Sequence, residues 1–169
     1  YMKLCGLPID KNYWKSKMEV DDLNNRKQEQ LIIEYIYDNL PKYRYNQLSL
    51  FEEVSKKINV QLSSVKQMIP IFKNLGINVK TDDDKESIEE NVINKSNHEF
   101  VSMWLKYKQF QHRITTFGES ILNKIRYNHI YSDFNTIVDT GRMVSRKGEI
   151  NFLNLPSDKE TRDCFRAMK

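Results

Sequence analysis

The amino-acid sequence predicts a mainly helical protein with a small β portion, that is, an α+β fold. Three observations lead to this prediction. Apolar residues recur at helical spacing up to about residue 127, only 5 Gly and 4 Pro occur among 169 residues, and the pattern then changes to short apolar runs separated by turn residues. With 39% hydrophobic residues, a chain of this length can bury a core of its own. We expect a helical body, followed by the first strands of a sheet that this chain does not complete.

Two helices are predicted before residue 60. Apolar residues at helical spacing cover residues 20–40, and Pro41 stops the run. A second helix is expected over residues 48–57.

Two shorter helices are predicted next. The Ser63-Ser64 pair can cap the first of them, and Gly76 closes it. Thr81, followed by three aspartates, has the form of a capping box with acidic residues in the first turn. The next helix is therefore expected from Thr81 through Ile93.

A long helix with a heptad seam is predicted after residue 96. Ser96, with Glu99 three residues on, is its start signal. The seam repeats at intervals of three and four residues, which implies a helix of nearly ~40 Å that packs lengthwise on another helix. Gly118 is expected to end or bend it early. The seam residues are Phe100, Met103, Tyr107, Phe110, Ile114, Phe117, Ile121 and Ile125.

Short strands or extended loops are predicted in the last forty residues. They cover residues 131–138 and 150–155, separated by polar turn residues at 145–148, and Pro156 ends the second. Cys164, Phe165 and Ala167 are expected to begin a further strand.

Composition excludes several classes of protein. No apolar run approaches the ~20 residues that cross a bilayer, and the first residues lack a signal-peptide pattern, so we expect a soluble protein that is not secreted. Cys5 and Cys164 show no metal-ligand spacing, which fits a reducing compartment. Residues 101–169 carry 12 Lys+Arg against 7 Asp+Glu, whereas residues 1–100 carry 15 against 16. A basic C-terminal third slightly favours a polyanion such as nucleic acid over a plain solvated surface. The start at Tyr1 suggests a piece of a longer protein.

Specific motifs lie near the C-terminus. The stretch DTGRMVSRKGEINFLNLP, followed by DKETRDCFRA, resembles the pattern T-G-R-L-S-S, P-N-L-Q-N-I-P and R-x-x-F of family A (DNA polymerase I-like) DNA polymerases. It departs from that pattern in a loop about two residues longer, in Val144 for a serine and in Leu153 for a glutamine. The matching positions are Thr140, Gly141, Arg142, Ser145, Asn151, Asn154, Pro156, Arg162 and Phe165.

Upstream segments resemble the same family in the expected order. MKLCGLPIDKNYW is similar to the entry of the thumb, LSSVKQ to the thumb tip, and TTFGESIL to the end of the long thumb helix. The resemblance implies a helical thumb over residues 1–127 and the start of the palm over 128–169, truncated before the catalytic aspartate motif.

The resemblance implies part of a DNA-directed DNA polymerase that holds primer–template duplex during templated nucleotidyl transfer in DNA replication. The dNTP and the two-metal Mg²⁺ site belong to the complete enzyme, with the remaining palm and fingers in the same or a second polypeptide. No catalytic residue and no bound cofactor are expected in this chain, so we expect no polymerase activity from it alone. The compartment implied is the cytoplasm of a bacterial or phage-infected cell, or an organelle.

The resemblance implies DNA contacts for particular residues near the C-terminus of this chain. Arg142 is expected to touch the minor groove at the primer end, where acceptors common to all base pairs report pair geometry, or else to be a surface arginine in a turn. Asn151 and Asn154 are expected to donate to such acceptors or to bond their own loop. Arg162 matches the R-x-x-F element. The three histidines show no ligand spacing and are assigned no chemistry.

Two further groups are expected to bind phosphates. Ser63, Ser64, Lys66 and Gln67 lie at a predicted helix N-terminus, where free N–H groups favour phosphate, although plain serine capping needs no DNA. Arg113, Thr115 and Thr116 match the family's primer-strand phosphate segment; a helix-interior hydroxyl also commonly bonds the carbonyl one turn back.

One alternative from another class stays open. The chain also fits a non-catalytic helical module that binds a protein or a nucleic acid, with the heptad seam facing a partner. Salt-dependent binding of duplex DNA distinguishes the two functions.

Overall fold

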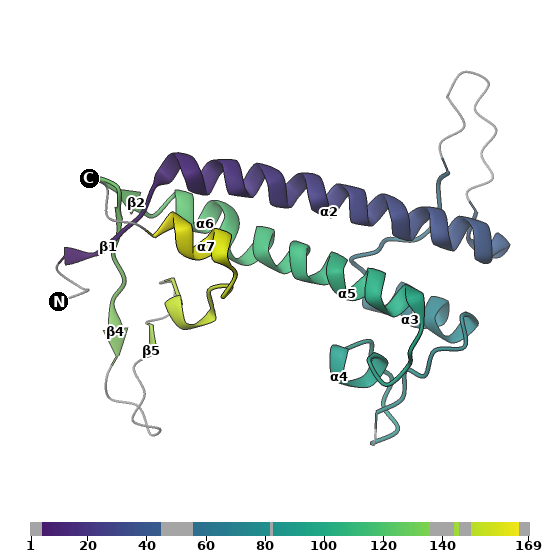
Figure 1. The fold of residues 1–169 in the computed structure, drawn as a ribbon. Coiled ribbons are helices and arrows are strands. Elements are labelled where there is room, and N and C mark those ends of the chain that lie inside the picture. The colour runs from purple at the N-terminus through teal and green to yellow at the C-terminus, as the bar shows by residue number, and fades with distance from the viewer. Residues whose placement is uncertain (1–4, 45–55, 82, 136–143, 146–149, 166–169) are drawn as a thin grey trace. The chain divides into compact units, whose positions relative to one another are not determined.

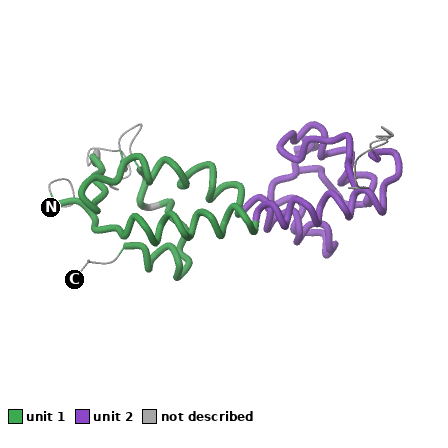
Figure 2. Tube along the Cα trace, turned by 90° about the horizontal axis from the view of Figure 1, so that it is seen from above, with its two compact units in different colours: residues 1–24, 110–169 green, residues 25–109 purple. Residues whose placement is uncertain are grey.

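The computed structural model describes residues 5–44, 56–81, 83–135, 144–145 and 150–165 (Figure 1). The fold is α+β, as predicted, with helices and small antiparallel sheets. The chain forms two compact units (Figure 2): the terminal unit, residues 1–24 with 110–169, and the middle unit, residues 25–109. Helices α2 and α5 contribute residues to both. The predicted boundary between thumb and palm near residue 127 is a functional division and stays a prediction.

Helix α2 covers Lys11–Asn39. It begins earlier than the predicted start at residue 20, because the carboxylate of Asp10 accepts the N–H groups of Asn12 and Tyr13, both at 3.0 Å, and so caps it. Its end is as predicted. Pro41 opens the short 3₁₀ helix η1, Pro41–Tyr43, instead of extending α2.

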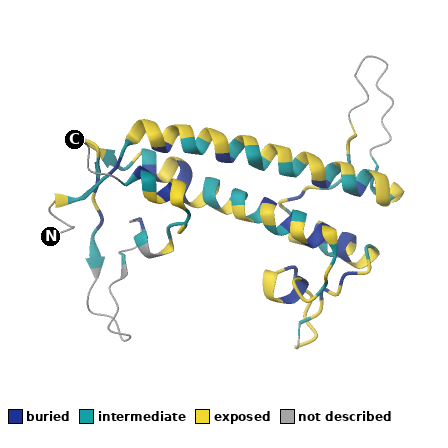
Figure 3. Cartoon of the chain, viewed as in Figure 1, coloured by how far each residue is buried: buried dark blue, intermediate teal, exposed yellow. Residues whose placement is uncertain are grey.

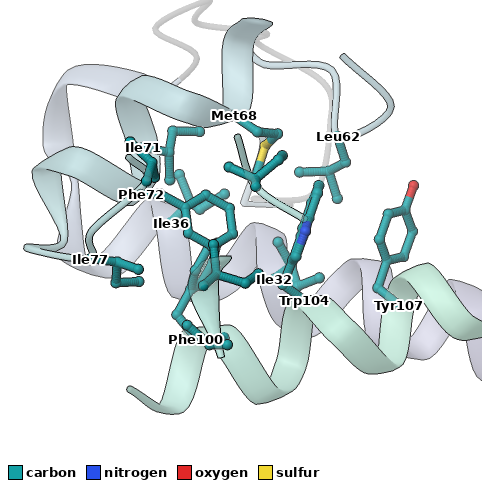
Figure 4. Close-up of a cluster of buried hydrophobic side chains, with 14 residues drawn as sticks. Ile32, Ile36, Leu62, Met68, Ile71, Phe72, Ile77, Phe100, Trp104 and Tyr107 are labelled. Carbon is teal, nitrogen blue, oxygen red and sulfur yellow. The ribbon is translucent and has the colours of Figure 1, made fainter. Parts of the chain in front are cut away.

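The middle unit is built around aromatic residues of two helices. Helix α3, Val65–Asn74, alternates buried and exposed positions at helical spacing (Figure 3). Helix α5, Glu99–His112, supplies Phe100 and Trp104, whose rings lie 5.1 and 5.6 Å from that of Phe72. The amide of Gln28 in α2 donates to the Met103 carbonyl at 3.1 Å. Figure 4 shows this core, whose labelled members are Ile32, Ile36, Leu62, Met68, Ile71, Phe72, Ile77, Phe100, Trp104 and Tyr107.

Glycine ends α3 as the sequence predicts. Gly76 has φ +75°, the left-handed conformation that glycine adopts without the steric cost of a Cβ.

The capping box predicted at Thr81 is wrong. The Thr81 hydroxyl accepts the N–H of Lys85 at 3.1 Å, and the backbones of Lys80 and Glu86 pair in an isolated β-bridge. Thr81 therefore begins a tight β-turn and not a helix. Only the four-residue helix α4, Glu90–Ile93, forms at the end of the predicted span.

Two other start signals have different outcomes. Helix α5 begins at Glu99, where Ser96 predicts a start, but the ring of His98 makes the local bond, since its Nδ1 accepts the N–H of Phe100 at 3.1 Å. The predicted helix at 48–57 lies mostly outside the described residues, and its last two positions, 56–57, are not helical.

The seam helix is not one regular α-helix. After α5 it continues as a π-helical segment, η2, Arg113–Gly118, and then as α6, Glu119–Leu122. Gly118 therefore marks a change of helix type and not the end of the helix. Of the predicted seam residues, Met103, Phe110, Ile114 and Ile125 are only partly buried, whereas Phe100, Tyr107, Phe117 and Ile121 are buried. The wider π turn shifts the register only of the seam residues that follow Arg113.

A three-stranded antiparallel sheet joins the two ends of the terminal unit. Strand β3, His129–Ile130, pairs with β1, Leu7–Pro8, on one side and with β2, Ile125–Arg126, on the other. Gly6 is required beside β3, because a Cβ there would lie 3.0 Å from the carbonyl oxygen of Ile130.

The predicted C-terminal strands are shorter than expected or absent from the described residues. Within 131–138 only β4, Phe134–Asn135, is described as a strand; it pairs with β5, Val144–Ser145, so Ser145 is not in a turn. The predicted strand at 150–155 contains the 3₁₀ helix η3, Phe152–Asn154, instead.

The strand predicted at Cys164 and Phe165 is wrong. Cys164 ends helix α7, Lys159–Cys164, which Asp158 caps by accepting the Thr161 N–H at 2.8 Å. Burial raises the pKa of Cys164 to about 11, so its thiol is protonated at neutral pH. The core of the terminal unit contains Ile9, Trp14, Phe117, Ile121, Ile130, Ile150 and Cys164.

Candidate nucleic-acid interface

The N-terminus of α3 carries the first group of predicted DNA contacts. Ser64 holds the N-cap position with extended backbone, but within the described residues its side chain makes no capping bond. Its carbonyl accepts the N–H groups of Gln67 and Met68, both at 3.1 Å. In the part of the chain described, no acceptor bonds the N–H of Val65 or Lys66, so two donors point from a positive helix end.

The four predicted residues at this helix end differ in availability. The side chain of Gln67 already bonds the neighbouring backbone, since its Oε1 accepts the N–H of Gln61 at 2.7 Å. Ser64 is half-buried, whereas Ser63 and Lys66 are exposed. Lys66 is therefore the side chain best placed to reach an anion at the free donors.

The second group lies in the π-helical segment η2. The Thr115 hydroxyl donates to the Gln111 carbonyl at 2.8 Å, which is the local bond that a helix-interior threonine usually makes. Thr116 lies 3.1 Å from Nδ1 of His112. Both threonines are exposed, but the Thr115 hydroxyl uses its only proton in this bond and has none left to donate to a phosphate.

Arg113 belongs to a network of charges in the terminal unit. Its guanidinium lies 3.5 Å from the carboxylate of Asp158 and 4.0 Å from that of Asp21. Asp21 in turn pairs with Lys17 at 2.5 Å, and the side chains of Lys17 and Asp21 are only 8% and 12% exposed. The network connects α2, η2 and the start of α7. Its carboxylates partly neutralise the charge of Arg113, which is the residue predicted to contact a DNA phosphate.

Ionised Asp158 is stabilised by this network. Burial opposes its ionisation, but the N–H and hydroxyl of Thr161 and the charges of Arg113 and Lys17 outweigh burial and hold its pKa below the ordinary value of 3.8. A carboxylate with a lowered pKa in the folded state stabilises that state at pH values above its unfolded pKa.

The Asp158→Asn variant is expected to unfold more easily than the parent at pH 7, by about 1 kcal/mol, because asparagine caps a helix but has no charge for Arg113. The difference is expected to shrink as the pH falls from about 4 towards the lowered pKa, since the parent then loses its charge as well. Urea unfolding from pH 7 to pH 3 measures it, within the window set by these pKa values. A difference that stays constant over this range contradicts the role given to the charge.

The third group lies near α7. Asn151 is half-buried and its carbonyl accepts the N–H of Asn154 at 3.1 Å, so the pair closes the turn of η3. The side chains of Asn154 and Arg162 are exposed. Arg142 lies outside the described residues.

Lys17, Asp21 and Asp158 were not identified as site residues from the sequence. Only one signal was readable, the i,i+4 spacing of Lys17 and Asp21 on a helix. The contacts of Arg113 with two distant carboxylates follow from the tertiary fold. The structure thus connects Arg113 to the cap of α7, whereas Ser63, Ser64, Lys66 and Gln67 belong to the middle unit.

The described residues do not fit a Mg²⁺ site. Across the described ranges, no three His, Cys, Asp or Glu side chains gather as a metal site requires. We therefore derive no step through a metal. Among the helices described, none is both long and apolar enough to span a bilayer.

Comparison with known proteins relates the fold of this chain to a solved polymerase domain. No protein-family model and no curated protein matches the chain. A solved structure does match: the fold is shared with part of a polymerase domain.

That structure is the POL domain of Pol1 from M. smegmatis, in complex with DNA primer-template and dNTP. The sequences are 21% identical, the TM-score is 0.65, and the match covers 97% of this chain. The chain spans only 27% of the length of that polymerase chain.

Proposed function

We propose that this chain is part of a DNA-directed DNA polymerase and holds primer–template duplex DNA during replication, in the cytoplasm or an organelle. One observation carries the proposal: nearly the whole chain, 97%, shares its fold with a POL domain that was solved with DNA primer-template and dNTP. The order of the sequence motifs along the chain supports the same assignment.

In finer terms, the proposed family is family A, with residues 1–127 as the thumb and 128–169 as the start of the palm. The dNTP, the Mg²⁺ ions and the catalytic carboxylates belong to other parts of the complete enzyme. Arg142, Asn151, Asn154 and Arg162 face the minor groove or the backbone near the primer end in this proposal. Arg113, Thr115 and Thr116 lie along the primer strand.

The start of α3 is the proposed grip on the duplex backbone. The two free N–H groups and the positive end of the helix dipole favour a phosphate oxygen, and exposed Lys66 adds a full charge. These groups read no base, so they hold any sequence. A polymerase requires this property, since it moves along its template.

The Lys66→Ala variant is expected to bind duplex DNA more weakly and with a salt slope smaller by about 0.9, because one phosphate contact releases about that number of counterions. Fluorescence anisotropy of a labelled duplex, titrated between about 50 and 200 mM salt, measures both quantities. Lys85→Ala is the matched control, since it removes one exposed lysine from the same unit.

Equal slopes for Lys66→Ala and the parent would place the phosphate contact elsewhere. No binding of duplex DNA by the parent at any salt concentration in this range would contradict the proposed function as a whole.

One observation favours the alternative of a protein-binding module. Val20 and Leu23 lie on α2 with 56% and 52% of their surface exposed. Apolar side chains that cluster on an exposed helix face are typical of a protein contact. Salt-independent retention of a protein partner, without duplex binding, would decide for this alternative.

A further inference from the structure

The β2–β3 hairpin forms one side of an open pocket in the terminal unit. The pocket has a volume of about 490 Å³, which lies within the range of small-ligand sites. Strand β2 is labelled in Figure 1, and β3 lies between it and β1 in the sheet. The lining residues are Asn123, Lys124, Arg126, Tyr127 and Tyr131.

The chemistry of the lining favours an anion with an aromatic group. The side chains supply two positive charges, an amide and two phenol rings, with no carboxylate among them. Another open groove of this unit differs, because Asp21 and Glu160 line it together with Lys17 and Arg113. Of these two grooves, the hairpin pocket alone has cations and aromatic rings but no carboxylate among its described lining residues.

The hairpin fixes where these side chains lie. Neighbouring residues of a strand face opposite sides, so Ile125 packs on the core of the terminal unit while Arg126 is exposed. Within the described residues, no carboxylate forms an ion pair with Arg126. The charge of Arg126 is thus available at the pocket.

Tyr127 is held in an unusual position. It is 93% exposed and has φ 49°, a left-handed conformation that a bulky residue adopts only at a cost of roughly 1 kcal/mol. The turn is retained by Nδ1–H of His129, which donates to the Tyr127 carbonyl at 2.9 Å. A tyrosine at the tip of a hairpin, with both ring faces in water, is available for stacking.

Tyr131 forms the second aromatic wall. The His129 ring lies 6.4 Å from it. A Cβ on Gly6 would lie 3.0 Å from its Cε1 atom, so the backbone at Gly6, just before β1, packs closely against it. The ring is therefore backed by the sheet, unlike that of Tyr127.

We propose that this pocket binds single-stranded nucleic acid. An unpaired base stacks on Tyr127 or Tyr131, and Arg126 pairs with the adjoining phosphate. A duplex does not fit this chemistry, because its bases stack on one another and present only their edges. The site goes beyond the proposed grip on duplex at α3 and η2, and does not depend on it.

The test compares single-stranded and duplex DNA on the 169-residue chain. Anisotropy of a labelled oligothymidine of about 12 nucleotides is measured for the parent and for Tyr127→Ala, Tyr127→Phe and Arg126→Ala. Lys15→Ala and Tyr13→Ala are matched controls, since each removes one exposed cation or one exposed tyrosine of the same unit outside the pocket. Circular dichroism establishes that all variants are folded.

Tyr127→Ala and Arg126→Ala are each expected to weaken single-strand binding at least about fivefold, which is the lower limit of one stacking contact. Tyr127→Phe is expected to bind as the parent does, because the ring face is kept. The controls and the binding of duplex by Tyr127→Ala are expected to change less than about twofold.

Three results overturn the inference. The first is a parent chain that does not bind the oligothymidine, and the second is equal losses in the controls, which would indicate charge alone. The third is an equal loss of duplex binding in Tyr127→Ala, which would make the hairpin part of the duplex grip. If the α3 site is wrong, Lys66→Ala keeps the salt slope of the parent, while binding of the oligothymidine by the hairpin pocket is unaffected. The two proposals can therefore fail independently.

Discussion

Phe100→Ala is expected to lower the free energy of unfolding of the middle unit by about 3–5 kcal/mol. Phe100 is fully buried, and its ring lies 5.1 Å from that of Phe72 and 5.4 Å from that of Tyr35. Truncation removes these contacts and leaves a cavity between three helices that cannot close without moving them. A loss of this size is a large part of the total stability of a domain.

The two tryptophans make the measurement specific. Trp14 is in the terminal unit and Trp104 in the middle unit, so a Trp14→Phe background leaves one fluorescent reporter, next to the substituted ring. Denaturant unfolding in this background gives the stability of the middle unit. Val65→Ala, at a position 48% exposed on α3, is the control and is expected to change the free energy by at most about 0.5 kcal/mol. Similar unfolding midpoints for the two variants would show that Phe100 is not a core residue.

Lys17→Met is expected to destabilise the terminal unit by about 3 kcal/mol, because it leaves the carboxylate of Asp21 without its nearest cation in a mostly buried position. Arg113, at 4.0 Å, compensates only part of this charge. Replacing both partners, Lys17→Met with Asp21→Leu, is expected to restore most of the stability, since a buried ion pair gains little over an apolar pair of similar size.

Trp14 fluorescence in a Trp104→Phe background reports this unit. Lys15→Met is the control, because Lys15 is exposed on the same helix two residues earlier. A loss in Lys17→Met no greater than in this control would refute the buried pair. A double variant as unstable as the single one would show that Lys17 acts by packing on Trp14, whose ring lies 5.8 Å from its Nζ, and not by its charge.

Helix ends set by backbone chemistry were predictable from the sequence. Pro41 after α2 and Gly76 after α3 impose their stops locally, whatever surrounds them. The first part of α2 was not predictable from periodicity. Residues 11–19 contain only Tyr13, Trp14 and Met18 as apolar side chains, too few to show a helical period.

The wrong predictions at Thr81 and Cys164 share a physical cause: the same local sequence pattern is compatible with two different structures. Thr81 with its aspartates fits a capping box, yet the same hydroxyl closes a β-turn equally well. The apolar pair at Cys164 suggested a strand, but Asp158 supplies a helix cap six residues earlier and decides the outcome.

The candidate site was predictable only where it is local. The start of α3 is a continuous motif, so its exposed Lys66 was identified from the sequence. The pairing of Arg113 with Asp21 and Asp158 joins three segments far apart in the chain, and no spacing rule reports it. The same applies to the hairpin pocket, where Lys124, Arg126, Tyr127 and Tyr131 come together only because β2 and β3 form a hairpin.

The pairing of β1 with β3 also sets the order in which the chain folds. Leu7 and Ile130 are about 120 residues apart, so their pairing closes a long loop, whereas the middle unit is one continuous segment with its own core. The middle unit can therefore fold before the last sixty residues have left the ribosome, and its collapse shortens the loop that β1 has to close. Phe100→Ala is therefore expected to slow the refolding of the terminal unit, followed by Trp14 fluorescence, although it alters none of its residues.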